Sequence, residues 1–161
     1  MKRLILIRHG KAEDGTSEIS DFERSLTEKG KVIAHHMALR LKEIEKSPGV
    51  LMTSPAFRAL ETAIIFAGEF RTSPDAVIMN SNLYFKMSYR NLPALLSTIE
   101  EDTETLTLFG HNPSFTEIAN SLCKEGCDFI PKTGVICISF KIMTWSQITP
   151  SSGKTEYFLK P

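Results

Sequence analysis

The hydrophobic positions of this chain are gathered into short apolar runs that are separated by longer amphipathic segments. The runs lie at residues 3–7, 49–53, 76–80, 105–110 and 134–140, and a weaker one lies near the end at 155–159. Runs of this length, rich in Val, Ile, Leu and Thr and bounded by turn-forming residues, are typical of strands in a buried sheet. We therefore predict a strand at each of these positions.

The longest amphipathic segment, residues 27–46, is predicted to be a helix with one apolar face. Its apolar residues recur at the spacing that a helix needs in order to bury one side. The residues expected on the buried face are Val32, Ile33, His36, Leu39 and Ile44. The neighbouring His35 is then expected to face solvent, and neither histidine has a metal-binding partner four residues away.

Further segments of the chain also have the pattern of helices. These segments are residues 54–70, 89–101 and 112–125. The first begins with Ser54 and Pro55, which suit the N-cap and the first helical position. The second is shorter and is interrupted by Pro93, and the third begins with a capping-type residue, Asn112, before a proline.

The order of these elements predicts an α/β fold. Strands that alternate with helices favour a mainly parallel sheet with helices on both faces. The last two strands have only short polar connections, so the far end of the sheet is expected to be antiparallel. No repeat, low-complexity tract or linker divides the sequence, which indicates a single domain over residues 1–161.

Polar and charged residues follow the apolar runs at three places. Arg8, His9 and Gly10 end the first predicted strand, Ser54 and Arg58 follow the second, and His111 follows the fourth. Ligands of such sheets bind beyond the carboxyl ends of the strands. We therefore expect these three clusters to converge on one edge of the sheet.

Composition narrows the classes of function. The 161 residues carry 19 basic and 19 acidic side chains, so the formal net charge is zero. This balance argues against broad binding to nucleic acids or to anionic membranes. The opening residues contain too short an apolar run for a signal peptide, and no stretch is long and apolar enough to span a bilayer.

The three cysteines, Cys123, Cys127 and Cys137, fit reduced thiols in the cytoplasm. Cys123 and Cys127 lack the second pair of ligands that structural zinc normally requires. We therefore interpret the cysteines as inert structural thiols and expect no metal site.

The residue types at the predicted edge suit a phosphoryl group. Arg8 and Arg58 each offer a planar fork of donors that matches phosphate oxygens, and the helix N-terminus near Arg58 adds positive potential. His9 could act as a nucleophile and His111 as a donor opposite it, while Gly10 would let the backbone approach a ligand closely. Each residue alone is more often structural or solvated, so the hypothesis rests on their convergence.

Several motifs carry a resemblance that covers nearly the whole chain. They are, in order, LIRHGKAE, DFERSLTEKG, MTSPAFRALETA, LFGHNP and IPKTGVICISF. Together they resemble the histidine phosphatase superfamily with its phosphoglycerate-mutase-like fold, and the short length and the Asp-x-x-Arg-x-Leu-Thr-x-x-Gly element resemble its small SixA-type phosphohistidine phosphatase branch.

That resemblance implies a role for each matching residue. His9 would be the phosphorylated nucleophile, and Arg8, Arg58 and His111 would form the rest of the phosphate pocket. Arg24, which its position alone would mark as a loop cation, would be a further phosphate-facing arginine. The resemblance also implies a metal-independent phosphatase that needs no cofactor.

One feature departs from larger members of the superfamily, which carry a Glu or Asp general acid after the third strand. Residues 80–99 of this chain contain no carboxylate. The proton donors left to consider are Glu13, Asp14, Asp21, Tyr84 and Lys86, and a donor could also be unnecessary.

The substrate expected from this pattern is a phosphorylated protein. The chain lacks the large insertions that cover small substrates in bigger relatives, so an open pocket is expected. Phosphohistidine on a signalling protein then fits best. The alternatives are a small phosphorylated metabolite, phosphoserine, phosphothreonine or phosphotyrosine, and a non-catalytic module that docks phosphoproteins.

Overall fold

Each predicted apolar run contains a strand in the computed structural model, which describes residues 1–85 and 87–161. The strands are β1 (Lys2–Arg8), β2 (Val50–Thr53), β3 (Ile78–Met79), β4 (Thr105–Gly110), β5 (Val135–Phe140) and β6 (Lys154–Leu159). They form one sheet in the order β3-β2-β4-β1-β5-β6. The central position of β1 explains its apolar sequence, because both of its faces are covered.

The direction of the strands confirms the predicted topology. β1 pairs in parallel with β4, β4 with β2, and β2 with β3. β5 runs antiparallel to β1, and β6 antiparallel to β5. Only β3 is much shorter than its apolar run, because it lies at the sheet edge and both of its residues are exposed.

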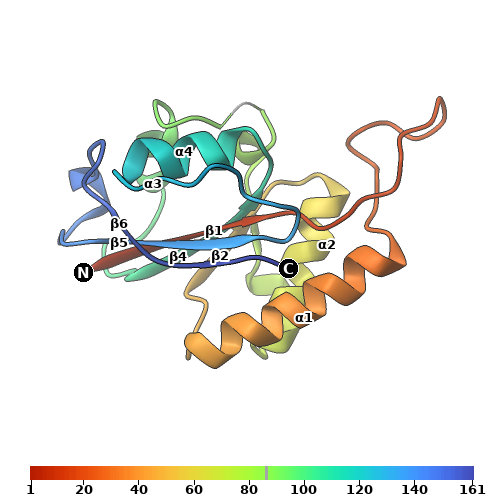
Figure 1. Cartoon of the computed structure of the whole chain (residues 1–161), viewed down its shortest axis with the longest axis horizontal. Coiled ribbons are helices and arrows are strands. Elements are labelled where there is room, and N and C mark those ends of the chain that lie inside the picture. The colour runs from red at the N-terminus through yellow and green to blue at the C-terminus, as the bar shows by residue number, and fades with distance from the viewer. Residues whose placement is uncertain (86) are drawn as a thin grey trace.

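Helices cover both faces of the sheet, as Figure 1 shows. They are α1 (Glu28–Ile44), α2 (Phe57–Glu69), α3 (Leu92–Leu96) and α4 (Ser114–Leu122), with short 3₁₀ turns η1 (Pro74–Ala76), η2 (Ser81–Leu83) and η3 (Trp145–Gln147). Leu4 and Leu6 of β1 pack into the core on the side of α3 and α4. Ile5 and Ile7 pack into the core under α1 and α2. The expected mixed α/β fold is therefore confirmed.

The predicted buried face of α1 was wrong except at Ile33, which is half-buried and packs against the core; the expectation that His35 faces solvent is confirmed. The helix buries Gly30, Ala34, Met37, Ala38 and Leu41 instead. Val32, Leu39 and Ile44 are exposed, and His36 is exposed together with His35. The cause is close packing through small residues: a side chain at Gly30 would collide with the backbone of Lys11. Residue size, rather than hydrophobicity alone, selects this face.

The start of α2 also differs from the prediction. The helix begins at Phe57, its N-cap is Ala56, and no side chain of the described residues caps it. Ser54 and Pro55 therefore lie before the helix. Arg58 falls in the first turn, where its side chain is buried. The Ser54 hydroxyl oxygen accepts a hydrogen bond from the Ala56 amide at 3.3 Å, but its shorter contact is with His111.

The starts of the other two helices, α3 and α4, also contain a proline. Pro93 lies in the first turn of α3 and so begins the helix rather than interrupting it. Asn112 lies one residue before the N-cap of α4, and its side-chain oxygen accepts hydrogen bonds from the amide and the hydroxyl of Thr116 at 3.3 and 3.0 Å. Among the described residues no helix is long and apolar enough to cross a membrane.

Candidate active site

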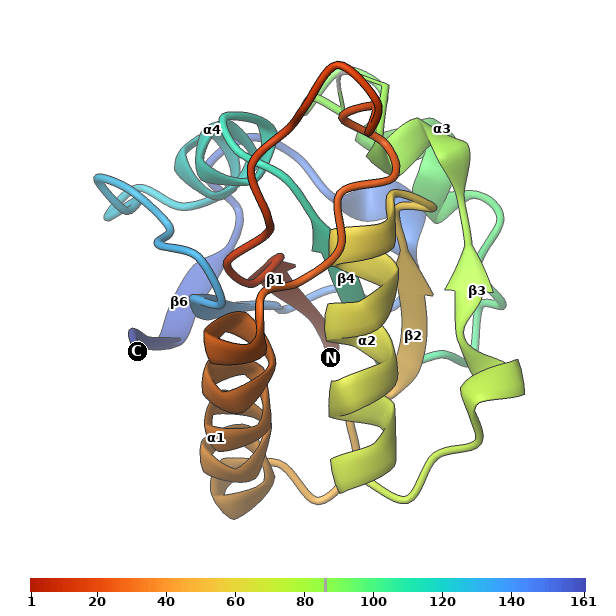
Figure 2. The ribbon, with the colours of Figure 1, turned by 90° about the vertical axis from the view of Figure 1, so that its right-hand side faces the viewer.

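His9 lies at the carboxyl end of β1, at the edge that faces the viewer in Figure 2. Its side chain is buried, and its Nδ1 lies 2.7 Å from the carbonyl oxygen of Gly10. Because a carbonyl oxygen only accepts, the ring proton belongs on Nδ1 and the lone pair on Nε2. The backbone hydrogen bond thus sets which nitrogen of His9 is free to react.

The surroundings of His9 keep its ring neutral. Burial is the largest cause that lowers the pKa of His9, which falls to about 3. The hydrogen bond to Gly10 opposes this shift, while the charges of Arg58 and Arg8 add to it. At neutral pH His9 is therefore an uncharged base beside two guanidinium groups.

His111 follows β4 and faces His9 across the site. The two ring centroids are 5.0 Å apart. His111 Nε2 lies 2.8 Å from the Ser54 hydroxyl, and burial lowers the pKa of His111 to about 4, with Arg58 adding to the effect. Nδ1 of His111 is buried without a hydrogen-bond partner among the described residues. Ser54, which we predicted as a helix cap, instead positions a site histidine.

Arg58 and Arg24 are joined by the carboxylate of Asp21. Arg58 Nη2 donates to Asp21 Oδ2 at 2.9 Å, and Arg24 Nη1 donates to Oδ1 at 2.9 Å. Burial alone would raise the pKa of Asp21, but the hydrogen bonds from Arg58 and Arg24 outweigh it and lower the pKa. Asp21 is thus held ionised between two arginines that are 34 positions apart in the chain.

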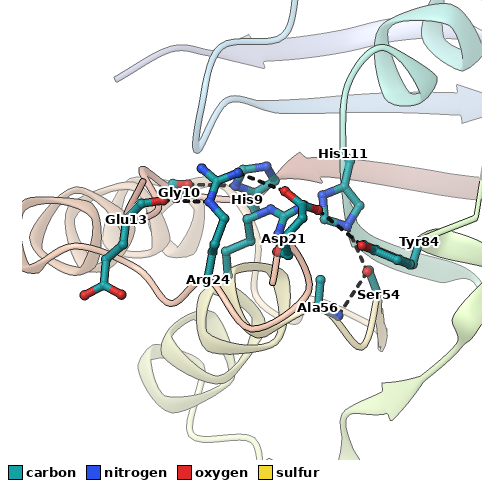
Figure 3. A network of polar contacts seen from close by, with 10 residues as sticks. His9, Gly10, Glu13, Asp21, Arg24, Ser54, Ala56, Tyr84 and His111 are labelled. Carbon is teal, nitrogen blue, oxygen red and sulfur yellow. Dashed lines mark hydrogen bonds and ion pairs between the residues drawn. The ribbon is translucent and has the colours of Figure 1, made fainter. Parts of the chain in front are cut away.

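The loop between β1 and α1 brings Arg24 to the site. Arg24 Nε donates to the backbone oxygen of Glu13 at 2.7 Å, while the Glu13 side chain points away from the cluster (Figure 3). Asp14 is exposed. Of the carboxylates in this loop that we considered as proton donors, Asp21 therefore lies within the cluster, and Glu13 contributes its backbone.

Tyr84 reaches the same cluster from the segment after β3. Its hydroxyl donates to Asp21 Oδ2 at 3.2 Å, and its ring meets the His111 ring edge-on at 5.7 Å (Figure 3). Burial and the hydrogen bond to Asp21 raise the pKa of Tyr84. Tyr84 and Asp21 are thus the two predicted donors that the structure places here, and Lys86 lies outside the described residues.

Arg8 is held on another side, by the segment before β5. Its Nη1 donates to the Ile130 carbonyl oxygen at 3.0 Å, and its Cζ lies 5.0 Å from the centroid of the Phe129 ring. Burial lowers the pKa of Arg8 below its usual value. Its Nε is buried without a hydrogen-bond partner among the described residues.

Thr133 was missed by sequence reasoning, although it lies within the motif IPKTGV. Its amide donates to the backbone oxygens of Arg8 and His9 at 3.0 and 3.2 Å, which fixes the end of β1. Its hydroxyl is also buried without a partner in the described part of the chain. A Cβ at Gly10 would lie 3.1 Å from Leu26 Cδ2, so the Leu26 side chain would have to shift by a small amount to accommodate it. Buried polar atoms without partners thus gather at this edge, on Arg8, His111 and Thr133.

The structure brings His9, His111, Arg8, Arg58 and Arg24 to one edge of the sheet. In the part of the chain that is described, no group of three or more His, Cys, Asp or Glu side chains is arranged to hold a metal ion. The arrangement places a neutral imidazole base beside a cluster of guanidinium groups. Such a cluster suits an anion that can be attacked at its centre.

Comparison with known proteins adds a family and a fold. Residues 4–79 match the family model of the histidine phosphatase superfamily, branch 1. No curated protein matches the sequence. This match agrees with the superfamily that the sequence motifs indicated.

Solved structures resemble the whole chain. SixA from Agrobacterium tumefaciens is 19% identical with a TM-score of 0.80, over 99% of this chain and 98% of that one. The protein histidine phosphatase SixA complexed with tungstate is 19% identical with a TM-score of 0.74, over 98% and 96%. A mycobacterial glucosyl-3-phosphoglycerate phosphatase with inorganic phosphate is 14% identical with a TM-score of 0.68, over 98% and 96%. These similarities confirm the predicted phosphoglycerate-mutase-like fold.

Proposed function

Because residues 4–79 match the family model of the histidine phosphatase superfamily, we propose that the chain is a metal-independent phosphatase in which His9 carries the phosphoryl group. The observation that carries this proposal is the hydrogen bond from His9 Nδ1 to the Gly10 carbonyl oxygen, at 2.7 Å. It leaves Nε2 as an unprotonated nucleophile inside a pocket of cations.

The reaction proceeds in two steps. The Nε2 lone pair of His9 attacks phosphorus, and the bond from phosphorus to the leaving group breaks with its electron pair on the leaving group. Water then attacks the same phosphorus, the bond to Nε2 breaks, and inorganic phosphate leaves with His9 restored. His111 and the arginines donate to the phosphoryl oxygens while charge redistributes.

The charges of the site match a phosphate monoester. Arg8, Arg24 and Arg58 bring three positive charges, and Asp21 bridges the last two and removes one. The remaining charge is opposite to that of a phosphoryl dianion. Asp21 also fixes both guanidinium groups, so they lose less side-chain entropy when phosphate binds.

For the substrate we propose phosphohistidine on a protein, such as a histidine-phosphorylated signalling protein. Residues 80–99 carry no carboxylate, and Asp21 is held ionised by two arginines, which makes it a weak proton donor. Phosphohistidine needs little help, because its ring is protonated by solvent and leaves as neutral imidazole. The likeness to the protein histidine phosphatase SixA supports the same substrate class.

An alkyl phosphate, such as a small metabolite or phosphoserine, is the second candidate. Tyr84 and Asp21 favour it, because their hydrogen bond of 3.2 Å puts a hydroxyl proton beside the phosphate-facing groups. A positioned acid contributes about 10²–10⁴-fold to the departure of a basic leaving group. The likeness to a glucosyl-3-phosphoglycerate phosphatase supports a metabolite in the same way.

The test measures single-turnover phosphoryl transfer to His9. The substrates are aryl phosphates of graded leaving-group pKa and two peptides that carry phosphohistidine or phosphoserine. We expect transfer to slow steeply as leaving-group pKa rises, with phosphohistidine far ahead of phosphoserine. Equal rates on the two peptides, or a flat dependence, would show that a general acid acts, and Asp21 and Tyr84 would be the positions to mutate first.

Two controls separate an enzyme from a docking module. The variant His9→Ala should abolish turnover while it still binds phosphate or tungstate through the arginines. Turnover in wild type should also persist in EDTA, because catalysis is proposed to need no metal. Binding without any phosphate on His9 of wild type would favour the docking module, and loss of activity in EDTA that one metal restores would overturn the mechanism.

We also propose that the protein acts in the cytoplasm. Cys123, Cys127 and Cys137 are all free thiols in the structure. Reduced cysteines are typical of that compartment.

A further inference from the structure

A shallow depression of about 590 Å³ opens beside Arg8. It is lined by Arg8, Phe129, Pro131, Lys132, Lys160 and Pro161. The cationic side chains come from three separate parts of the chain: the end of β1, the segment before β5 and the residue after β6. No Asp or Glu side chain is among the described residues that line it, although the last residue of the sequence, Pro161, carries a terminal carboxylate.

The cationic side chains of this depression are not held in ion pairs within the described structure. Among the described residues, Arg8, Lys132 and Lys160 form no ion pair, whereas Arg3, Arg24 and Arg58 each do. Two of them lie over aromatic rings instead: Arg8 Cζ is 5.0 Å from the Phe129 centroid, and Lys160 Nζ is 4.7 Å from the Phe158 centroid. In a chain of zero net charge, this leaves a local region of positive potential.

The depression shares Arg8 with the proposed phosphate pocket. A peptide whose phosphorylated residue reaches His9 would therefore lay its neighbouring residues across Phe129, Pro131 and Lys132. The exposed Phe129 ring and Pro131 offer apolar contact to the stems of side chains, and the lysines offer charge. Glu and Asp can make both the apolar contact through their side-chain stems and the charged contact with the lysines.

We propose that this depression is a docking subsite for acidic residues that flank the phosphorylated residue of a protein substrate. The proposal rests on the proposed function, because it takes the substrate to be a phosphoprotein. The occupant follows from charge complementarity, which speeds encounter and fixes the direction in which a chain binds.

The loop that carries Arg24 disfavours acidic flanking residues on its own side of the site. It bears Glu18 and Glu23, both exposed, in addition to Asp21. An acidic segment placed against that loop would be repelled. Acidic flanking residues are therefore selected on the side of Lys132 and Lys160.

The experiment compares two phosphohistidine peptides that differ only in the flanking residues, which are Asp and Glu in one and Asn and Gln in the other. The measured quantity is the ratio of kcat/KM for the acidic peptide to kcat/KM for the neutral one. In wild type this ratio should exceed one and should fall towards one as salt is raised. The double variant Lys132→Glu, Lys160→Glu should lower the ratio by roughly 10-fold, since each exposed pair is worth a modest amount.

The matched control is Lys46→Glu, Lys141→Glu, which makes the same change of charge at exposed lysines near the opposite end of the sheet. It should leave the ratio at the wild-type value. Equal kcat/KM for the two peptides in wild type, or the same ratio in both double variants, would overturn the subsite and leave the phosphatase proposal standing. Failure of wild type to dephosphorylate either peptide would instead overturn the proposed substrate, and the subsite with it.

Discussion

Strand β1 carries an arginine near each end, and the two have opposite surroundings. Nη1 and Nη2 of Arg3 donate to the carboxylate of Glu45, which also accepts from the Tyr157 hydroxyl at 2.8 Å. The hydrogen bonds to Glu45 raise the pKa of Arg3 above its usual value. Arg8 has a backbone carbonyl and an aromatic ring as partners, and burial lowers its pKa.

The difference separates a structural charge from a functional one. Arg3 ties the start of β1 to the end of α1 and to β6 through a carboxylate that the protein itself supplies. Arg8 keeps a buried Nε without a partner in the described structure, which is costly for stability unless something else compensates. Of the two arginines of β1, the one without a carboxylate partner is thus the better candidate for binding an anion, whereas Arg24 and Arg58 share the carboxylate of Asp21.

Among the arginines, the largest effect should come from Arg8. We expect Arg8→Ala to lower kcat/KM by about 10²–10³, as for other preorganised donors to a charged transition state. Its stability should stay close to that of wild type, because the variant removes a buried donor that lacks a partner. Steady-state kinetics and urea unfolding of the same preparation measure both. A destabilised variant with unchanged kinetics would place Arg8 with Arg3 as a structural residue.

The converse effect should come from Arg3. We expect Arg3→Met to lower the free energy of unfolding by about 3 kcal/mol, because Glu45 is left buried without its cation. Turnover of the folded enzyme should not change. The double variant Arg3→Met, Glu45→Leu should recover much of the stability, since it removes both charges. A loss of activity in either folded variant would contradict the proposed division between the two ends of β1.

Arg24 should have a smaller effect than Arg8. A quarter of the Arg24 side chain is exposed, so solvent screens its charge. Its Nη1 also donates already to Asp21. We expect Arg24→Ala to lower kcat/KM by about 10–100-fold. Wild-type kinetics in this variant would remove Arg24 from the pocket and would show that its role does not follow from the sequence motif.

The sheet was predicted well because the signal for each strand lies in a short stretch of the sequence. Apolar runs locate the strands, and the alternation with helices orders them, so the convergence of His9, Arg58 and His111 followed from topology. The face of α1 did not follow, since close packing of Gly30 depends on where the backbone of Lys11 lies. The hydrophobic pattern of one helix contains no information about the distance between Gly30 and the Lys11 backbone.

The contacts that organise the site were also beyond local patterns. Asp21 meets Arg58 over 37 positions, and Ser54 meets His111 over 57 positions. Such pairs depend on how loops fold back on the sheet. Arg24 was found through the resemblance alone, because its position in a loop gave no sign that Asp21 would hold it beside Arg58.

The groups at the two ends of the sheet should lose their contributions to stability over different ranges of pH. The folded pKa values of His9 and His111 are lowered to about 3 and about 4, against 6.5 for a free histidine, because burial opposes their charge. Below pH 6.5 the unfolded chain therefore binds protons that the folded site refuses, so stability falls as pH drops from 6.5 towards 4. Burial alone would raise the pKa of Glu45, but the hydrogen bonds from Arg3 and Tyr157 outweigh it and lower the pKa. The contribution of ionised Glu45 to stability is therefore present above pH 4.5 and is lost only at lower pH.

The variant His111→Asn tests this separation with the smallest expected effect. Asn can still accept a hydrogen bond from Ser54 but cannot titrate, so one of the two neutral histidines is removed. Between pH 6.5 and pH 5.5 the variant should lose about 1 kcal/mol less stability than wild type, as the linkage of one such group requires. The variant Glu45→Gln should match the wild-type slope over that interval, since the Glu45 contribution changes only below it. Urea unfolding at constant ionic strength measures both slopes. A wild-type slope in His111→Asn would mean that the folded site accepts a proton as readily as the unfolded chain, and the carboxyl end of the sheet would then lack the uncharged histidine pair on which the proposed chemistry depends.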